Sequence, residues 1–448
     1  MLTMTVDHST DVSEAYARFM TSLGRWVDAC IERYADAPAT DVHDQGTYTT
    51  GWVPYVRERE DARALDFLKE RRDAIRDHFV ATGQWHHGYW GLQEAHHGTE
   101  HFELFLGSLL DLDPGDAETR RQILDAAEHI GNWVDDIPNW FNAEAHLFRS
   151  MYLGTREVRL EPGMELNIPD HMRFASLCLL ALRAGGGERY LDLASDYVGQ
   201  WADAILAGEH LPVGILPGGP VTDLTGRSEA AYRSFAGMAG HLDDDVDRVE
   251  NLLASNGVDV MLHLWQETGR TEFRFAVERL LDVLATQLDD PDAGAAADAI
   301  RTYRRATHAR RYDDAIRHAV APLDPLGIRE LSLQPDVDRS ERPHGIGKRS
   351  DKPNWFEDGK PQRHNPILLA VAAEVMDEGE LATAALDLGR TAFDLARRAL
   401  PDGRHHGCAA NTVSAIARGH GRENHAGVTT AILGALSLGE GGRPIFSE

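Results

Sequence analysis

The stretch Trp85–Glu103, WHHGYWGLQEAHHGTEHFE, combines the side-chain types that bind metals and transfer protons. Its nineteen positions include five histidines, three glutamates, two tryptophans and a tyrosine. Two glycines near its start indicate a loop, and the apolar spacing that follows indicates a helix. Within that helix Glu94, His97 and His101 lie at positions i, i+3 and i+7 and therefore share one face. Imidazole and carboxylate groups at these spacings can hold a divalent cation or act as a general acid or base.

Aromatic residues elsewhere in the chain stand close to amides and histidines. Aromatic rings can stack on the apolar C–H faces of sugars, while neighbouring amides hydrogen-bond the hydroxyl groups. The candidates for sugar binding are Trp90, Trp140, Asn142, Trp355, His364 and His405. Several arginines stand within two residues of a histidine, among them Arg173, Arg363 and Arg418. Because a guanidinium binds a carboxylate through two parallel hydrogen bonds, these arginines predict an acidic ligand.

The elements that must position these side chains are helices. Residues 11–37 and 60–82 show the spacing of long amphipathic helices. A further pattern, an apolar helix, a turn and an amphipathic helix, recurs over residues 101–134, 173–206, 259–288 and 365–400. A helix that is apolar all round must be buried, and its amphipathic partner must lie outside it. Stacked hairpins of this kind form a solenoid or a closed toroid, with short strands expected at 156–166 and 211–217.

Composition narrows the classes of function. The net charge of −27 opposes binding to nucleic acids and to anionic membranes. Three scattered cysteines do not indicate a disulfide framework, and no secretory signal or membrane span is visible. The sequence also contains no phosphate-binding loop and no dinucleotide fingerprint, so no nucleotide cofactor is expected. We therefore expect a cytoplasmic protein, monomeric or homodimeric.

The recurring hairpins resemble the (α/α)-toroid folds of carbohydrate-active enzymes from about Glu60 to the end of the chain. The apolar segment GVTTAILGALSL near the C-terminus is typical of an inner helix that closes such a ring. The resemblance implies an all-α, single-domain toroid over residues 1–448, with roughly six or seven hairpins and short rim strands. Residues 1–59 would supply an N-terminal helix and connection that pack on the ring.

Among these enzymes the chain looks most like the toroidal polysaccharide lyases, in particular the pectate lyases whose transition metal is held by two histidines and a glutamate. The resemblance implies β-elimination on a uronic-acid-containing oligo- or polysaccharide. It makes His97, His101, His146 and Glu100 the candidate metal ligands, with Glu94 and Glu144 as alternative carboxylates. Imidazole ligands favour Mn, Ni, Co or Zn over Ca. The candidate catalytic residues are His171 as base, Arg173 as carboxylate partner, Tyr89 as acid, and Arg363 and Arg418.

Three alternatives stay open at this point. A glycoside hydrolase would need a pair of carboxyl groups across the cleft, and Glu94, Glu100, Glu144, Asp170 and Glu357 are possible members. A sugar epimerase could use His171 with His364 or His425. A non-enzymatic helical-repeat scaffold would bind a partner in its concave surface.

Overall fold

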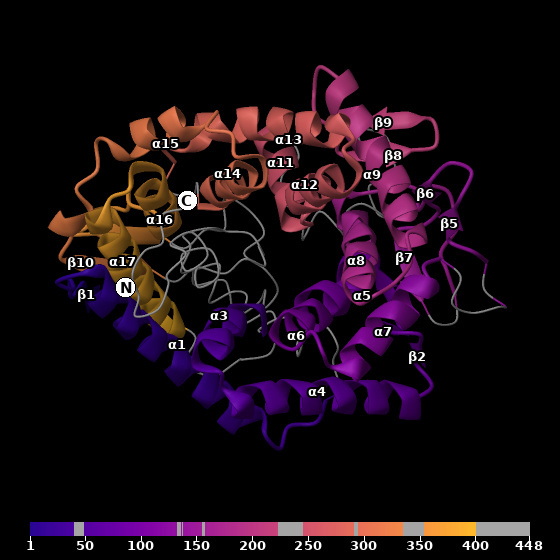
Figure 1. Ribbon diagram of the computed structural model, residues 1–448, viewed down its shortest axis with the longest axis horizontal. Coiled ribbons are helices and arrows are strands. Elements are labelled where there is room, and N and C mark those ends of the chain that lie inside the picture. Colours follow the sequence, from indigo (N-terminus) through magenta and orange to yellow (C-terminus); the bar gives the residue numbers. More distant parts are fainter. Residues whose placement is uncertain are drawn as a thin grey trace. The chain divides into compact units, whose positions relative to one another are not determined.

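A computed structural model of the chain describes residues 1–39, 49–131, 136, 138–154, 157–222, 245–290, 294–334 and 354–399 (Figure 1). Over these residues the protein is mostly helical, as expected, and its short strands form small antiparallel sheets. The chain divides into two compact units. Unit 1 contains Met1–Ala37, Thr50–Ala64 and the described residues from Leu281 onward. Unit 2 contains Pro38–Thr49 and Leu65–Leu280, as far as they are described.

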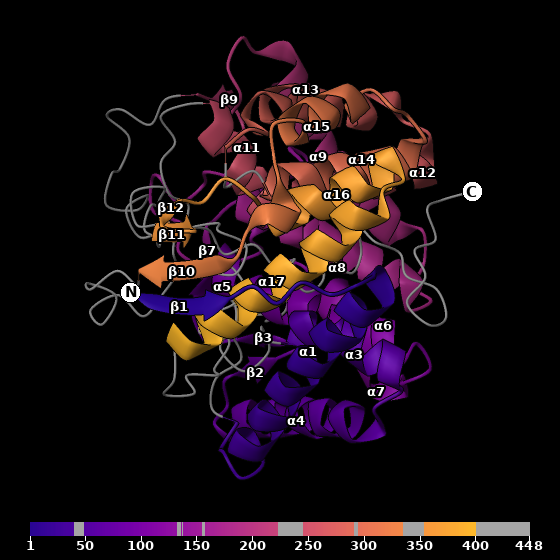
Figure 2. The ribbon, with the colours of Figure 1, turned by 90° about the vertical axis from the view of Figure 1, so that its left-hand side faces the viewer.

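Unit 1 is organised around a helix from each end of the described chain. Helix α1 (Val12–Tyr34) begins at Asp11, whose side chain accepts a hydrogen bond from the backbone N–H of Glu14. Its buried face packs along α17 (Gly379–Ala399), as Figures 1 and 2 show. The other helices of this unit are α3 (Thr49–Arg59), α14 (Gly294–Thr307), α15 (Asp313–Val320), α16 (Pro366–Met376) and the short 3₁₀ turns Ala285–Gln287 and Pro325–Gly327.

A four-stranded antiparallel sheet completes unit 1. Its strands follow the order β1 (Leu2–Thr5), β10 (Glu330–Gln334), β11 (Asn354–Glu357) and β12 (Lys360–Pro361). Leu2 pairs with Leu333, which in turn pairs with Trp355. The N-terminal strand therefore lies beside a strand from the C-terminal third of the chain (Figure 2). The backbone N–H and hydroxyl of Ser9 both donate to the buried carboxylate of Asp387 and hold this strand against α17.

Unit 2 contains two of the hairpins predicted from the sequence, those at 173–206 and, as far as Leu280, 259–288. Helix α8 (Met172–Arg183) packs on α9 (Arg189–Ala207), and α12 (Gly257–Thr268) is followed closely by α13 (Thr271–Leu284). The unit also contains α4 (Ala62–Ala81), α5 (Ala95–Glu100), α6 (Gly107–Leu112), α7 (Ala117–Glu128), α11 (Asp245–Ala254), a π-helix over His101–Leu106 and a 3₁₀ turn over Pro169–His171.

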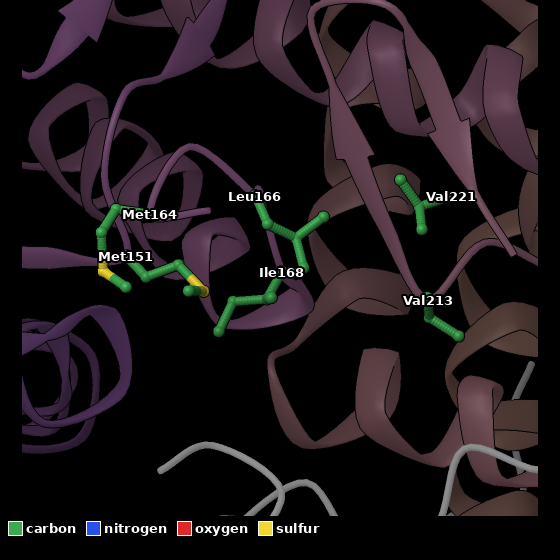
Figure 3. Close-up of a cluster of buried hydrophobic side chains, with 6 residues drawn as sticks. All are labelled: Met151, Met164, Leu166, Ile168, Val213 and Val221. Carbon is green, nitrogen blue, oxygen red and sulfur yellow. The ribbon is translucent and has the colours of Figure 1, made fainter. Parts of the chain in front are cut away.

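The connections between the helices of unit 2 contain short two-stranded antiparallel sheets. They join β2 (Trp85–His86) to β3 (Tyr89–Trp90), β4 (Leu92–Glu94) to β7 (Tyr152–Gly154), β5 (Phe141–Asn142) to β6 (Leu147–Phe148), and β8 (Gly214–Leu216) to β9 (Gly219–Val221). Beside them lies a cluster of apolar side chains from the loops and from strand β9 (Figure 3): Met151, Met164, Leu166, Ile168, Val213 and Val221. Their burial holds the long connection before α8 against the β8–β9 hairpin.

The predicted long helices and the hairpins at 173–206, 259–288 and 365–400 are confirmed in the described residues. Strands expected at 211–217 are present as β8, whereas residues 157–166, all described, contain no strand, and that prediction is wrong. Residues 161–165 form a turn in place of the strand, because Pro162 and Gly163 favour a turn.

The segment expected to close a ring lies outside the described residues, so the single-domain toroid stays a prediction. None of the described helices has the length and apolar character that a membrane span requires.

Candidate functional site

The histidine-rich stretch opens as a tight β-hairpin in unit 2. Trp85 pairs with Trp90 and His86 with Tyr89, which leaves His87 and Gly88 as a two-residue turn. Both turn residues have positive φ, 52° at His87 and 92° at Gly88. This is the backbone of a type I′ turn, whose twist matches that of the flanking strands. The turn therefore projects the His87 imidazole from the tip of the hairpin.

The hairpin is fixed to the last turns of α7. The hydroxyl of Tyr89 donates to the carbonyl oxygen of Ala126 at 2.8 Å. A Cβ added to Gly88 would lie 3.2 Å from the Cβ of Ala126 and 3.0 Å from a ring carbon of Phe102, so the turn backbone lies directly against the helix. Burial raises the pKa of Tyr89 well above its usual value, so its hydroxyl remains a neutral hydrogen-bond donor.

This packing brings His87 to Asp125 of α7 and to His129, the residue that follows the helix. Nδ1 of His87 lies 2.9 Å from Oδ1 of Asp125. Nδ1 of His129 lies 2.7 Å from the backbone oxygen of Asp125 and 3.4 Å from its Oδ1. The two imidazole rings stack with centroids 3.5 Å apart and planes 5° apart. The three side chains are 39%, 33% and 27% exposed, so solvent reaches them.

Among the described side chains, these three form the single group of three or more ligand-type residues whose donor atoms lie within 4.8 Å of one another. Sequence reasoning singled out His87 only as part of a histidine-rich stretch and did not include His129. The i, i+4 spacing of Asp125 and His129 on a helix was the available signal, because such residues share a face. Nothing in the local pattern connects that helix to His87.

The predicted metal ligands do not form this group. His101 is 1% exposed and begins the π-helix, where the rings of Trp85, Phe102 and Phe105 surround it. Neither of its ring nitrogens has a hydrogen-bond partner among the described residues. Burial, with a smaller contribution from Arg72, lowers its pKa to about 3. His101 is therefore a neutral side chain of the core.

The remaining predicted metal ligands have different surroundings. His146, at φ 51°, has its Nδ1 3.4 Å from a carboxylate oxygen of Asp196. His97 and Glu100 lie on α5, and their side chains fall outside those that the structure describes. The set His97, His101, His146 and Glu100 stays a prediction, and only His87, Asp125 and His129 meet in the described part of the chain.

His171 and Arg173, the predicted base and carboxylate partner, lie at the start of α8 with no exposed surface. Nε2 of His171 donates to the backbone oxygen of Ser150 at 3.0 Å, and its Nδ1 accepts from the backbone N–H of Ile168 at 3.2 Å. Burial lowers the pKa of His171, opposed by its backbone hydrogen bonds. In this conformation neither ring nitrogen is available to a substrate, and His171 fastens the connection that the apolar cluster of Figure 3 also holds.

The predicted sugar-binding residues of unit 2 differ in exposure. Trp140 is 1% exposed and packs on the rings of Tyr89, Phe148 and Phe174. Asn142 accepts hydrogen bonds from the backbone of the β5–β6 turn. Trp90 is half-buried, with its ring 5.2 Å from that of Phe79. Of these three, Trp90 keeps an indole surface for a ligand.

In unit 1, Trp355 is 7% exposed within β11, and His364 is 8% exposed just before α16. Nδ1 of His364 lies 2.9 Å from the carboxylate of Glu357, and its Nε2 accepts from the backbone N–H of Asp324 at 3.1 Å. The ring thereby connects the end of β11 to the loop that contains Asp324 and to the start of α16. Arg363 beside it is exposed. The predicted residues His405, Arg418 and His425 lie outside the described residues.

Comparison of the chain with protein-family models, with curated proteins and with solved structures found no match.

Proposed function

We propose that the chain is a lyase that cleaves uronic-acid-containing oligo- or polysaccharides by β-elimination with the help of a divalent cation. The observation that supports this most is the meeting of two imidazoles and a carboxylate, all open to solvent, beside the indole-bearing hairpin β2–β3. The (α/α) toroid expected from the helical hairpins remains the scaffold that we propose for this reaction.

The reaction removes a weakly acidic proton. A base takes the proton from C5 of the uronate, the C–H electron pair forms the C4=C5 double bond, and the C4–O bond breaks. An acid then protonates the leaving oxygen. A bound cation would neutralise the sugar carboxylate and so stabilise the charge that develops at C5. His87, Asp125 and His129 are the described residues best placed to hold that cation.

The hairpin also supplies groups for substrate binding and proton transfer. Trp85 and Trp90 are cross-strand partners, so both half-buried indoles lie near Phe79 on the face of the hairpin opposite His86, where their exposed surface can stack against a sugar ring outside the cation site. His86 is the cross-strand partner of Tyr89, which faces α7, so His86 lies on the α7 side of the hairpin. We propose His86 as the base, while Tyr89 and His171 hold the scaffold.

The histidine pair His171 and His364, expected for the epimerase alternative, does not have free ring nitrogens. A histidine pair for epimerisation would need two imidazoles with accessible nitrogens. His171 has both nitrogens bonded to backbone groups, and His364 has one bonded to a carboxylate and one to a backbone N–H. Neither ring offers a nitrogen to a sugar.

The test is to incubate the purified protein with a panel of uronate glycans and follow the ultraviolet absorbance of a conjugated C=C–carboxylate. We expect absorbance to rise, to stop rising with chelator, and to resume when one divalent metal is restored. His86→Gln should lower the rate by about 100-fold or more, the range of a lost general base. His263→Gln, on the exposed face of α12, is the matched control. Without a rise on any glycan the lyase proposal fails, and a reducing-end assay then tests hydrolysis.

A further inference from the structure

The backbone around His87 fixes its place at the tip of the β2–β3 hairpin. A type I′ turn favours Asn, Asp or Gly at its first position, because these residues reach positive φ most easily. Histidine, like Asn and Asp, is enriched among non-glycine residues with positive φ, and His87 adopts φ 52°. The turn is also fixed in place, because Gly88 lies against Ala126 and Phe102 and the adjacent Tyr89 bonds to the backbone of α7. The backbone of the turn thus places His87 over the end of that helix.

The donor atoms have the spacing of a metal site. Neighbouring ligands around a tetrahedral or octahedral ion with bonds of about 2.1 Å lie about 3.0–3.4 Å apart. Oδ1 of Asp125 lies 2.9 Å from Nδ1 of His87 and 3.4 Å from Nδ1 of His129. Both nitrogens therefore face one carboxylate oxygen at distances close to those of ligands that share an ion.

We propose that His87, Asp125 and His129 form a binding site for one first-row transition ion. When the ion binds, the proton of each neutral imidazole moves from Nδ1 to Nε2 by exchange with solvent, which frees the Nδ1 lone pair, and Asp125 supplies the negative charge. Parallel rings cannot aim both lone pairs at one point, so one ring turns out of the stack on binding. His87 is the ring that turns, because its side chain is the most exposed of the three.

The ligand set defines the class of ion. Two imidazoles and one carboxylate suit Zn²⁺, Co²⁺, Ni²⁺ or Mn²⁺, whereas Ca²⁺ requires six to eight oxygen ligands. Three protein ligands leave coordination positions for water or for an oxygen of a ligand. The net charge of −27 also raises the local concentration of cations around the protein.

The test uses the full chain freed of metal with a chelator and titrated with Zn²⁺ or Co²⁺ alone at pH 7.5. Calorimetry should show one site that depends on these residues, and Co²⁺ should develop visible absorption bands. His87→Asn keeps a residue suited to the turn and should weaken binding at that site by about 100-fold or more, since even outer-shell changes cost 10–100-fold. Asp125→Asn and His129→Gln should have similar effects, whereas His263→Gln, which alters a histidine 3.6 Å from Glu267, should have none.

Two outcomes would overturn the proposal. In the first, the wild-type protein takes up neither ion, so the three side chains are only a hydrogen-bonded group. In the second, His87→Asn remains folded by circular dichroism and binds the ion as tightly as the wild type, so the ion binds elsewhere. Because binding is measured without any glycan, its result is independent of whether the protein proves to be a lyase.

Discussion

The buried imidazole of His101 should make the stability of the protein depend on pH. The side chain is 1% exposed, lies among three aromatic rings, and has no hydrogen-bond partner for either nitrogen among the described residues. Its pKa is lowered from 6.5 to about 3, mainly by burial and further by the charge of Arg72. The folded protein therefore keeps this ring neutral at pH values where the unfolded chain protonates it.

The sign and size of the effect follow from proton linkage. Below pH 6.5 the unfolded state binds a proton that the folded state excludes, so the free energy of unfolding falls as the pH falls. One pKa unit corresponds to about 1.4 kcal/mol. The free energy of unfolding should therefore fall by about 2 kcal/mol between pH 7.5 and 5.0, and by about 5 kcal/mol in total once the pH is below 3. Above pH 6.5 this contribution is constant.

The assay compares the wild type with His101→Phe by urea unfolding at pH 7.5 and 5.0, followed by circular dichroism. Phenylalanine has a similar shape, suits the aromatic surroundings and does not titrate. Between pH 7.5 and 5.0 the free energy of unfolding of the wild type should fall by about 2 kcal/mol more than that of the variant. The slope of the free energy against urea concentration should be the same for both proteins. His171 is present in both proteins, so its contribution cancels. His101→Leu provides a second apolar variant, and His263→Gln should behave as wild type.

An equal pH dependence in wild type and His101→Phe would refute the reasoning, because no titrating group would then have been removed. Nuclear magnetic resonance of histidine-labelled protein gives an independent measurement. The ring of His101 should still be neutral at pH 5.0, and a protonated ring at that pH would show that water or a charged partner reaches it.

Two further predictions concern the packing of each unit. In unit 1 the carboxylate oxygens of buried Glu374 lie 2.8 Å from a guanidinium nitrogen of Arg304 and 2.6 Å from one of Arg305. Glu374→Gln should lower the free energy of unfolding in urea by about 3 kcal/mol, because two guanidiniums lose their shared carboxylate. An unchanged unfolding midpoint would contradict this. In unit 2, Trp140→Ala should lower the free energy of unfolding by about 3–5 kcal/mol, because the ring fills the core between Tyr89 and α8. Thermal unfolding measures this change. A loss below about 1 kcal/mol would show that the ring is not packed as described.

The helices could be predicted from the sequence because their signals are local. The almost wholly apolar segment 366–375 is buried along its entire length in α16, as a helix without a polar face must be. The amphipathic segment that follows became α17, which is buried on all sides from Leu381 to Gly389 and has its partly exposed charged residues, Arg390, Asp394 and Arg397, in its second half. Apolar spacing determined both helices, and the intervening Asp377 and Glu378 at the turn separated them.

The candidate site could be predicted only in part. The sequence identified the histidine-rich stretch, but the choice of metal ligands came from the resemblance to lyases and, for His97 and His101, from a shared helix face. That argument said nothing of burial, and His101 lies in the core rather than at a surface. His87 and His129 belong to elements far apart in the chain, and the contact between them depends on a positive-φ turn that packs on α7 through Gly88 and Tyr89. Local periodicity fixes which side chains a helix presents, whereas the tertiary packing of one element on another decides which of them meet.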